Sequence, residues 1–407
     1  KYRFQKMEKK MVIDYVNDGK IINEKFINQN FQFNSKDFRR DENNNNVITF
    51  VGYTVNNEND MLVSFPKHFI PTELDKDTNV LLKTIFKHMK NYPDKYIGDK
   101  SLYSSNYPFT SFFNVYNYYI KYGLLLEDEI KITTKEKNKI NWKKSIKDSN
   151  KYIQDNGIIL YPLFYNNQLY FKDLIAKCVT FVINYTSIKF GNIIKTEVID
   201  FDIDYEMFIS NKEYIVNELL KLQTSTFNDN LLYLLNNLIL FFKEINEGGN
   251  IYIKHYNYEM IWEDMVKKYL SFNYSDIKDE EMIFKYQEKP IIFKNEVFRP
   301  NLANEFQYIQ PDYYYENDKL KLIFDAKYYE KINGLNYKQV VYYLLLNEFN
   351  SKHKEMFCAL ILPSEETYTK VHFRMNPFYN TTYKDMVIYE TFLDIKIVMD
   401  FYLFQNI

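Results

Sequence analysis

Apolar and polar positions follow two different periods in the first third of the chain. Residues 47–55 and 61–65 are rich in β-branched and aromatic side chains, and the polar segment between them predicts a β-hairpin. Apolar residues in 73–89 recur every three or four positions, which predicts an amphipathic helix. A second helix is expected over 112–123. The N-terminal region is therefore expected to combine strands with helices.

The middle third has a helical pattern. Helices are predicted over 174–188 and 214–245, and the second is expected to break near 224–230. The triplet Asp155-Asn156-Gly157 predicts a turn before this stretch, and Gly248-Gly249 follows it. These breaks predict three regions, at 1–155, 156–250 and 251–407.

From residue 251 onward, helical and strand-like runs alternate. Helices are predicted over 258–270 and 336–348. Strands are predicted at 282–286, 291–293, 307–315, 319–328 and 355–362. This order is typical of a mixed sheet covered by helices. We therefore expect an α+β multidomain protein with an N-terminal β-containing region, a helical middle region and a C-terminal α/β core.

Composition narrows the functional classes. Apolar residues make up 46% of the 407 positions and charged residues 26%, which is the balance of a globular protein. No apolar run approaches the roughly 20 residues of a membrane-spanning helix, and the charged start lacks a secretion signal, so we expect a cytoplasmic protein. The two cysteines, Cys178 and Cys358, lie too far apart in sequence to suggest a disulfide framework or a cysteine-based zinc site. Glycine-rich phosphate-binding motifs are absent, so nucleotide hydrolysis by this chain alone is not expected.

The strongest chemical signal is Pro311-Asp312, followed after twelve residues by Asp325-Ala326-Lys327. Side chains at i and i+2 of a strand share a face, so Asp325 and Lys327 are expected to project together. A tight turn at 316–318 would bring Asp312 beside Asp325 on the neighbouring antiparallel strand. Carboxylates that hold Mg²⁺ (or Mn²⁺) next to a lysine are the groups that phosphodiester hydrolysis requires. The alternative is an exposed ion pair at a strand end, which contributes little to stability.

Two flanking helices extend this pattern. Glu263 lies on the helix before the strands, and Gln339 and Tyr343 stand four residues apart on one face of the helix after them. The complete set resembles the PD-(D/E)xK nuclease superfamily. The resemblance implies that Asp312 and Asp325 are metal ligands, Lys327 is the catalytic lysine, Glu263 is an accessory acid and metal ligand, and Gln339 supports the site. The alternatives are a solvated position for Glu263 and a buried packing pair for Gln339 with Tyr343.

Longer segments carry a closer resemblance. They are Asp325-Ala326-Lys327-Tyr328-Tyr329, residues 337–343, Phe50-Val51-Gly52-Tyr53, Phe65-Pro66-Lys67 and residues 140–146. Together they resemble the LlaJI-type restriction endonuclease family, which is related to the nuclease subunit of McrBC-like systems. The resemblance implies a type II/IV restriction-like endodeoxyribonuclease of anti-phage defence that cleaves double-stranded DNA with an AAA+ (McrB-like) GTPase partner. It also implies that residues 1–155 serve in recognition or partner docking. The structural alternatives are that Gly52 marks a strand bend and that Trp142 is a core residue.

The sequence also allows other interpretations of the lysine-rich segment and of the function. Residues 131–151 hold eight lysines against Glu136 and Asp148, which suits either a DNA-binding patch with Trp142 or a solvated face. The chain could instead be a single-component nuclease of the repair or transposon-end type. A third reading is a non-cleaving adaptor that binds DNA or a partner and keeps the nuclease fold as a scaffold.

Overall fold

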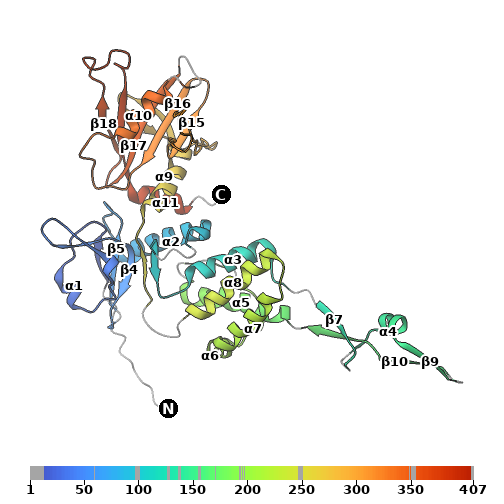
Figure 1. Ribbon diagram of the computed structural model, residues 1–407. Coiled ribbons are helices and arrows are strands. Elements are labelled where there is room, and N and C mark those ends of the chain that lie inside the picture. Colours follow the sequence, from blue (N-terminus) through green and yellow to red (C-terminus); the bar gives the residue numbers. More distant parts are fainter. Residues whose placement is uncertain are drawn as a thin grey trace. The chain divides into compact units, whose positions relative to one another are not determined.

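The computed structural model combines α-helices with several small β-sheets (Figure 1), so the chain belongs to the mixed α and β class that the sequence predicts. The structure describes residues 13–58, 60–96, 101–125, 129–135, 139–154, 157–169, 171–191, 194, 196, 198–245, 251–347, 349 and 354–404. Within these ranges no helix is both long and apolar enough to cross a lipid bilayer.

The chain forms two compact units, and their limits differ from the three predicted regions. The first unit joins Lys1–Asn106 to Gly248–Ile407, and the second is Tyr107–Glu247. The predicted boundary near 155 falls inside an antiparallel strand pair, β9 (Asn150–Gln154) with β10 (Gly157–Tyr161). Asp155-Asn156 and Gly248-Gly249 themselves lie outside the described residues.

The N-terminal sheet of the first unit has the strand order β1-β5-β4-β12-β6. Its strands are β1 (Ile13–Asn17), β4 (Val51–Val55), β5 (Met61–Phe65), β6 (Tyr103–Ser105) and β12 (Ile253–His255). The predicted hairpin is confirmed, because β4 and β5 pair antiparallel. Strand β12 comes from far along the chain and lies between β4 and β6, which joins the two ends of the chain into one unit.

Gly52 has a structural role at this junction. Its φ of 140° belongs to the region that favours glycine, and a Cβ atom there would overlap the carbonyl oxygen of Ile253 on β12. The close approach of β4 to β12 therefore requires glycine at this position, beyond the strand bend that the sequence suggests.

Smaller elements complete the N-terminal part. They are α1 (Glu24–Asn28), β2 (Phe38–Arg40), β3 (Asn46–Ile48), α2 (Leu74–Asn91) and the short 3₁₀ helices Ser35–Asp37 and Pro93–Tyr96. Helix α2 confirms the amphipathic helix predicted at 73–89.

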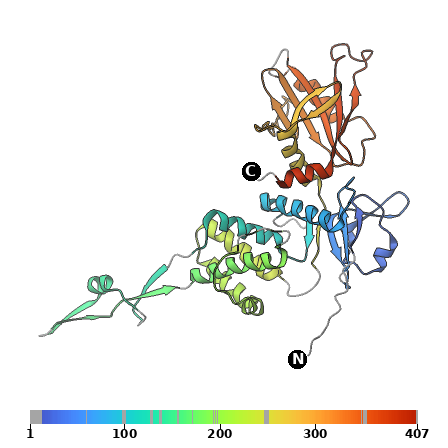
Figure 2. The same cartoon turned by 180° about the vertical axis from the view of Figure 1, so that it is seen from behind.

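The C-terminal sheet has the strand order β15-β16-β17-β19-β18, seen at the top of Figures 1 and 2. Its strands are β15 (Tyr313–Glu316), β16 (Leu320–Ala326), β17 (Glu355–Ser364), β18 (Tyr368–Arg374) and β19 (Val387–Asp394). The three central strands are parallel, and β15 and β18 pair antiparallel at the two edges. The sheet is therefore mixed, as expected.

Helices cover both faces of this sheet. On one face, α10 (Tyr337–Leu346) buries Tyr342 and Leu346 against a cluster that includes Ile323 of β16. On the other face lies α9 (Glu259–Asn273), where the Trp262 indole N–H donates to the carbonyl oxygen of Ile361 at 3.4 Å. Helix α11 (Ile395–Phe404) directly follows β19 and packs against α9. A side chain of β16 therefore contacts α10 or α9, depending on the face of the sheet to which it points.

Some C-terminal predictions need correction. Residues 291–293 form no strand in this described stretch, because only an isolated bridge links Lys294 to Tyr314. Strand β15 begins at Tyr313 rather than at residue 307. A small hairpin of β13 (Tyr274–Lys278) and β14 (Glu281–Phe284) follows α9, near the strand predicted at 282–286.

The second unit contains a helical part and a strand-rich part. The helices are α3 (Phe109–Tyr122), α5 (Phe171–Phe190), α6 (Tyr205–Ser210), α7 (Lys212–Thr224) and α8 (Asp229–Glu244). The predicted helix break near 224–230 is confirmed, because α7 ends at Thr224 and α8 begins at Asp229 with Asn228 as its N-cap. The other elements are β7 (Glu129–Thr133), β8 (Lys139–Ile140), α4 (Trp142–Asp148), β11 (Tyr165–Leu169) and the pair β9 and β10.

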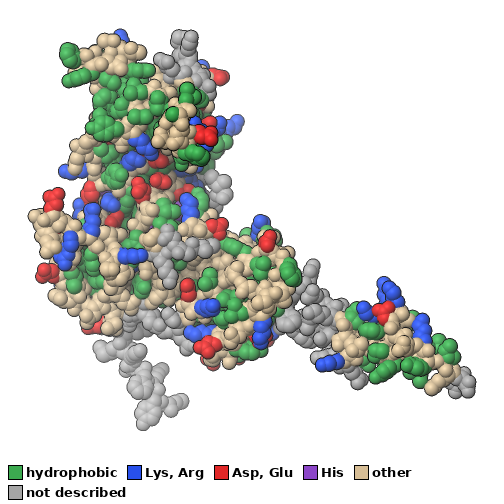
Figure 3. Space-filling view, viewed as in Figure 1, with side chains coloured by type: hydrophobic (Ala, Val, Ile, Leu, Met, Phe, Trp, Pro, Cys, Tyr) green, Lys and Arg blue, Asp and Glu red, His purple; other side chains and the backbone are tan. Residues whose placement is uncertain are grey.

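Trp142 does not occupy a core, contrary to the structural expectation. Its side chain is 58% exposed at the start of α4, where Asn141 caps the helix by accepting a hydrogen bond from the Lys144 N–H. Figure 3 shows apolar and lysine side chains side by side on this part of the surface. The exposed apolar residues are Trp142, Ile146, Tyr152, Ile153, Ile158, Ile159 and Tyr161. An exposed apolar surface of this kind is typical of a binding region.

Candidate active site

The hairpin of β15 and β16 brings Asp312 next to Asp325. Tyr313 pairs with Phe324, so the residue before β15 lies opposite the carboxyl end of β16. The Asp312 carboxylate accepts a hydrogen bond from the Ala326 N–H at 2.9 Å, and the Asp312 N–H approaches the Asp325 carboxylate at 3.4 Å. The two aspartates, which lie 13 positions apart in the sequence, are thus in direct contact in the structure.

Lys327 completes this cluster. Its ammonium lies 2.6 Å from the Asp325 carboxylate, and the Asp325 side chain is fully buried while that of Lys327 is 13% exposed. The Lys327 N–H donates to the Ile361 carbonyl oxygen at 2.8 Å, which holds the residue beside β17 after β16 has ended. A buried pair of this kind differs from the exposed strand-end ion pair that was the alternative.

Glu263 lies near the cluster without a direct contact in the described structure. The hydroxyl of Tyr313 donates to the backbone carbonyl of Glu263 at 2.7 Å, which ties α9 to β15. Burial, the nearby Glu259 and the Asp325 carboxylate raise the pKa of Glu263, and Lys327 opposes the shift. The charges of Asp325 and Lys327 therefore influence the ionisation of Glu263, although neither side chain contacts it directly in the described structure.

Gln339 is fully buried in the first turn of α10, and neither polar atom of its amide has a hydrogen-bond partner within the described residues. Tyr343, on the same helix face, is partly buried against the core. Both side chains are thus at least partly buried, as in the packing alternative, but the Gln339 amide makes no hydrogen bond to Tyr343. A buried amide without a partner is costly in free energy, and such a group is expected to bond to a water or ligand.

A series of hydrogen bonds links the start of α10 to His372 of β18 and Glu390 of β19. The Asn336 side chain caps the helix by accepting from the Gln339 N–H at 3.1 Å, and the Asn336 N–H donates to His372 Nε2 at 3.0 Å. Because Nε2 accepts here, the proton of the neutral ring lies on Nδ1, which is 2.6 Å from Glu390. His372 and Glu390 therefore orient the helix turn that faces Asp325.

Sequence reasoning missed Lys338, which precedes Gln339. Its ammonium lies 3.5 Å from the Asp325 carboxylate and 5.4 Å from the centre of the Tyr342 ring. Burial lowers the pKa of Lys338, but Asp325 and Tyr342 outweigh that effect and hold it above its ordinary value. No signal in the linear sequence separates this lysine from the many others, because its role depends on how α10 is rotated against the sheet.

Carboxylates are crowded in this cluster. Burial and the Asp325 carboxylate raise the pKa of Asp312 to about 7, against the opposing effect of Lys327. A bound cation would relieve this repulsion. Two carboxylates with water in the remaining positions suit Mg²⁺, which keeps several waters when it binds protein. Among the residues that the structure describes, no group of three or more His, Cys, Asp or Glu side chains is arranged to hold a metal, so Glu263 does not complete a three-acid set.

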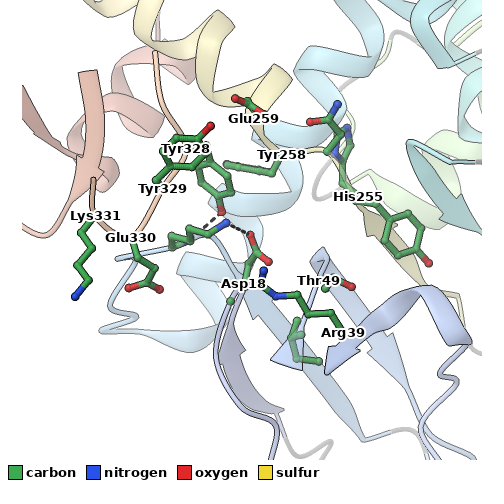
Figure 4. A pocket seen from close by; sticks show the side chains of 15 residues that line it. Asp18, Arg39, Thr49, His255, Tyr258, Glu259, Tyr328, Tyr329, Glu330 and Lys331 are labelled. Carbon is green, nitrogen blue, oxygen red and sulfur yellow. Dashed lines mark hydrogen bonds and ion pairs between the residues drawn. The ribbon is translucent and has the colours of Figure 1, made fainter. Parts of the chain in front are cut away.

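The strand end that carries Lys327 is also attached to the N-terminal sheet. The Lys67 N–H donates to the hydroxyl of Tyr328 at 2.9 Å, and the Lys67 ammonium lies 2.8 Å from Asp18 and 3.9 Å from the centre of the Tyr328 ring. Asp18 and Tyr328 line a common cavity (Figure 4). The volume of this cavity is about 490 Å³. Two of the motifs singled out in the sequence, at 65–67 and 325–329, therefore contact each other.

No protein-family model matches this chain, and no curated protein matches it in sequence.

Proposed function

We propose that this chain is a Mg²⁺-dependent DNA endonuclease of restriction type, with a PD-(D/E)xK catalytic core in residues 251–407. The observation that carries the proposal is the convergence of Asp312, Asp325 and Lys327 at one end of the C-terminal sheet. Burying two adjacent carboxylates is unfavourable unless a cation compensates them. A scaffold protein has no physical need for this arrangement.

Each residue of the cluster has a role in this proposal. Asp312 and Asp325 would hold Mg²⁺, which Mn²⁺ can replace, and Glu263 would act as an accessory acid. When bound, the ion would supply Lewis-acid chemistry to the phosphodiester and to an attacking water. Lys327 orients that water and stabilises the negative charge that develops on the phosphate.

The order of elements around the cluster supports the assignment. Helix α9 with Glu263 precedes the hairpin of β15 and β16, and α10 with Gln339 follows it. The Gln339 amide is fully buried and has no hydrogen-bond partner within the described residues, so a buried water would satisfy it. These features favour the nuclease core over an unrelated mixed sheet.

The wider setting is part of the proposal. The chain lacks a phosphate-binding loop, which is consistent with an AAA+ (McrB-like) GTPase supplied as a separate subunit in the cytoplasm. Residues 1–155 would dock on that partner, and nucleotide turnover there would license cleavage of double-stranded DNA. The exposed apolar residues of α4 and β9 give this region a surface suited to such contacts.

Plasmid cleavage tests the proposal. Purified wild-type chain and an Asp325→Asn variant are incubated with supercoiled plasmid and Mg²⁺, with and without the partner GTPase and nucleotide. Cleavage that needs both the partner and Asp325 is the expected result. Full cleavage without a nucleotide would instead favour the single-component nuclease, and no cleavage under any condition would favour the adaptor.

A further inference from the structure

An open groove borders the candidate active site and has no part in the mechanism given above. Its volume is about 470 Å³, within the ~300–1,000 Å³ typical of small-molecule sites. One wall is the segment 308–310, and the other is the first part of α10, from Tyr337 to Tyr342.

The groove is bordered by aromatic rings that the fold leaves in solvent. Tyr337 is 75% exposed and Tyr308 is 54% exposed. Apart from Lys338 and Gln310, the lining is aromatic or aliphatic. Exposed aromatic rings next to a cation are the usual platform for nucleic-acid strands, because every base has a flat face that can stack on them.

Both walls lead directly to the carboxylates. The hydroxyl of Tyr342 donates to the Gln310 carbonyl oxygen at 2.8 Å, which fixes one wall to the other, and Asp312 follows Gln310 by two residues. On α10, the half-exposed Lys338 lines the groove and lies 3.5 Å from Asp325. A phosphate held at the carboxylates would therefore have its neighbouring nucleoside within reach of the groove.

We propose that this groove binds one unstacked nucleotide of the strand being cut, with the base against Tyr337 and Tyr308 and the phosphate near Lys338. The inference rests on the proposed nuclease function and adds a substrate preference to it. A base inside an intact duplex is stacked on its neighbours and must leave the helix to enter the groove, which costs free energy. The chain should therefore bind single-stranded or splayed DNA more tightly than fully paired DNA.

The test is a binding titration by fluorescence anisotropy, with metal omitted so that the strand stays intact. The probes are a short single-stranded oligonucleotide, the same sequence as a duplex, and a single strand of abasic sugars. The variants are Tyr337→Ala and Tyr337→Phe. The control is Tyr379→Ala, another exposed tyrosine of the same unit, which lines no part of the groove.

The expected result is that Tyr337→Ala weakens single-strand binding roughly 5- to 150-fold, which corresponds to the ~1–3 kcal/mol of one base–aromatic stack. Tyr337→Phe should bind as wild type does, because the ring is kept. The Tyr337→Ala effect should be smaller on the duplex and disappear on the abasic strand. Because Tyr337 is mostly exposed, its removal is not expected to unfold the chain.

Three results would overturn the groove proposal. They are an unchanged single-strand affinity in Tyr337→Ala, an equal loss in Tyr379→Ala, and an equal loss on the abasic strand. A parallel plasmid cleavage assay with wild-type chain and Mg²⁺ keeps the two ideas separate. If wild type cleaves the plasmid but Tyr337→Ala binds single strands normally, the groove proposal is wrong and the nuclease proposal stands. If Tyr337→Ala loses affinity for base-containing strands but wild type does not cleave, the groove proposal stands and the nuclease proposal is wrong.

Discussion

Replacing Asp312 by asparagine should stabilise the fold at neutral pH while it removes activity. The pKa of Asp312 is raised from 3.8 to about 7 by burial and by Asp325. The unfolded chain therefore releases this proton near pH 4, whereas the folded chain retains it until near pH 7. The free-energy cost of ionising Asp312 is absent below about pH 4, grows between pH 4 and 7, and is complete above pH 7.

The size of the effect follows from the shift. About three pKa units at ~1.4 kcal/mol each give an upper limit of about 4 kcal/mol, and the remaining solvent access of Asp312 reduces this to roughly 2–4 kcal/mol. An asparagine at this position has nearly the same shape, and its amide oxygen can still accept from the Ala326 N–H. For a unit of this size, a gain of that order raises the melting temperature by ~4–8 °C.

Thermal unfolding between pH 4.5 and 8 measures this prediction. Asp312→Asn should melt at a higher temperature than wild type at pH 8, and the two curves should converge toward about pH 4.5. Asp318→Asn, which alters an exposed aspartate in the turn between the same two strands, is the control for loss of charge alone. Mg²⁺ should raise the melting temperature of wild type more than that of Asp312→Asn. If Asp312→Asn and wild type melt at the same temperature at every pH, crowding of the carboxylates does not destabilise the fold.

Three further predictions follow from the proposed function. Asp325→Asn should lower plasmid cleavage by at least about 10²-fold, because it removes a metal-binding charge, and wild-type nicking rates would take Asp325 out of the mechanism. Lys327→Met should slow single-turnover cleavage ~10²–10³-fold at unchanged Mg²⁺ affinity by calorimetry, and a rate within threefold of wild type would return Lys327 to a plain ion pair. Ile153→Asp on β9, where the side chain is 84% exposed, should weaken co-elution with the GTPase partner on size-exclusion chromatography without changing the melting temperature. Unchanged co-elution of Ile153→Asp would exclude β9 from the docking surface.

The hairpin that carries Asp312 and Asp325 could be predicted because its information is local. An aromatic run, a three-residue polar turn and the apolar run of β16 all lie within residues 312–327, and the two strands pair antiparallel across the turn. Similar local signals identified α2 and the break between α7 and α8. Where neighbours in sequence are also neighbours in space, the pattern of side chains was sufficient.

The remaining features depend on contacts that the pattern does not contain. Strand β12 is three residues long and pairs with β4 and β6 from far away in the chain, so the predicted regions at 1–155 and 251–407 were separated although they share a sheet. Lys338 reaches Asp325 only because α10 packs on the sheet at one particular rotation. Helix α9 was predictable, but its distance from the carboxylates was not, and Glu263 stays outside their direct contacts.

The shared sheet limits how the proposed docking region can be tested by deletion. A deletion of residues 1–155 would remove β4 and β6, the two partners of β12, and would also cut the second unit. It would therefore disrupt the fold rather than detach a docking module. Tyr328, one residue after Lys327, is held by Lys67, which in turn contacts Asp18. The segments that follow β1 and β5 therefore contact the chain one residue after Lys327. A substitution at Lys67 would therefore perturb the chain one residue away from Lys327, the lysine proposed for catalysis, without altering the surface of α4 and β9 proposed for docking.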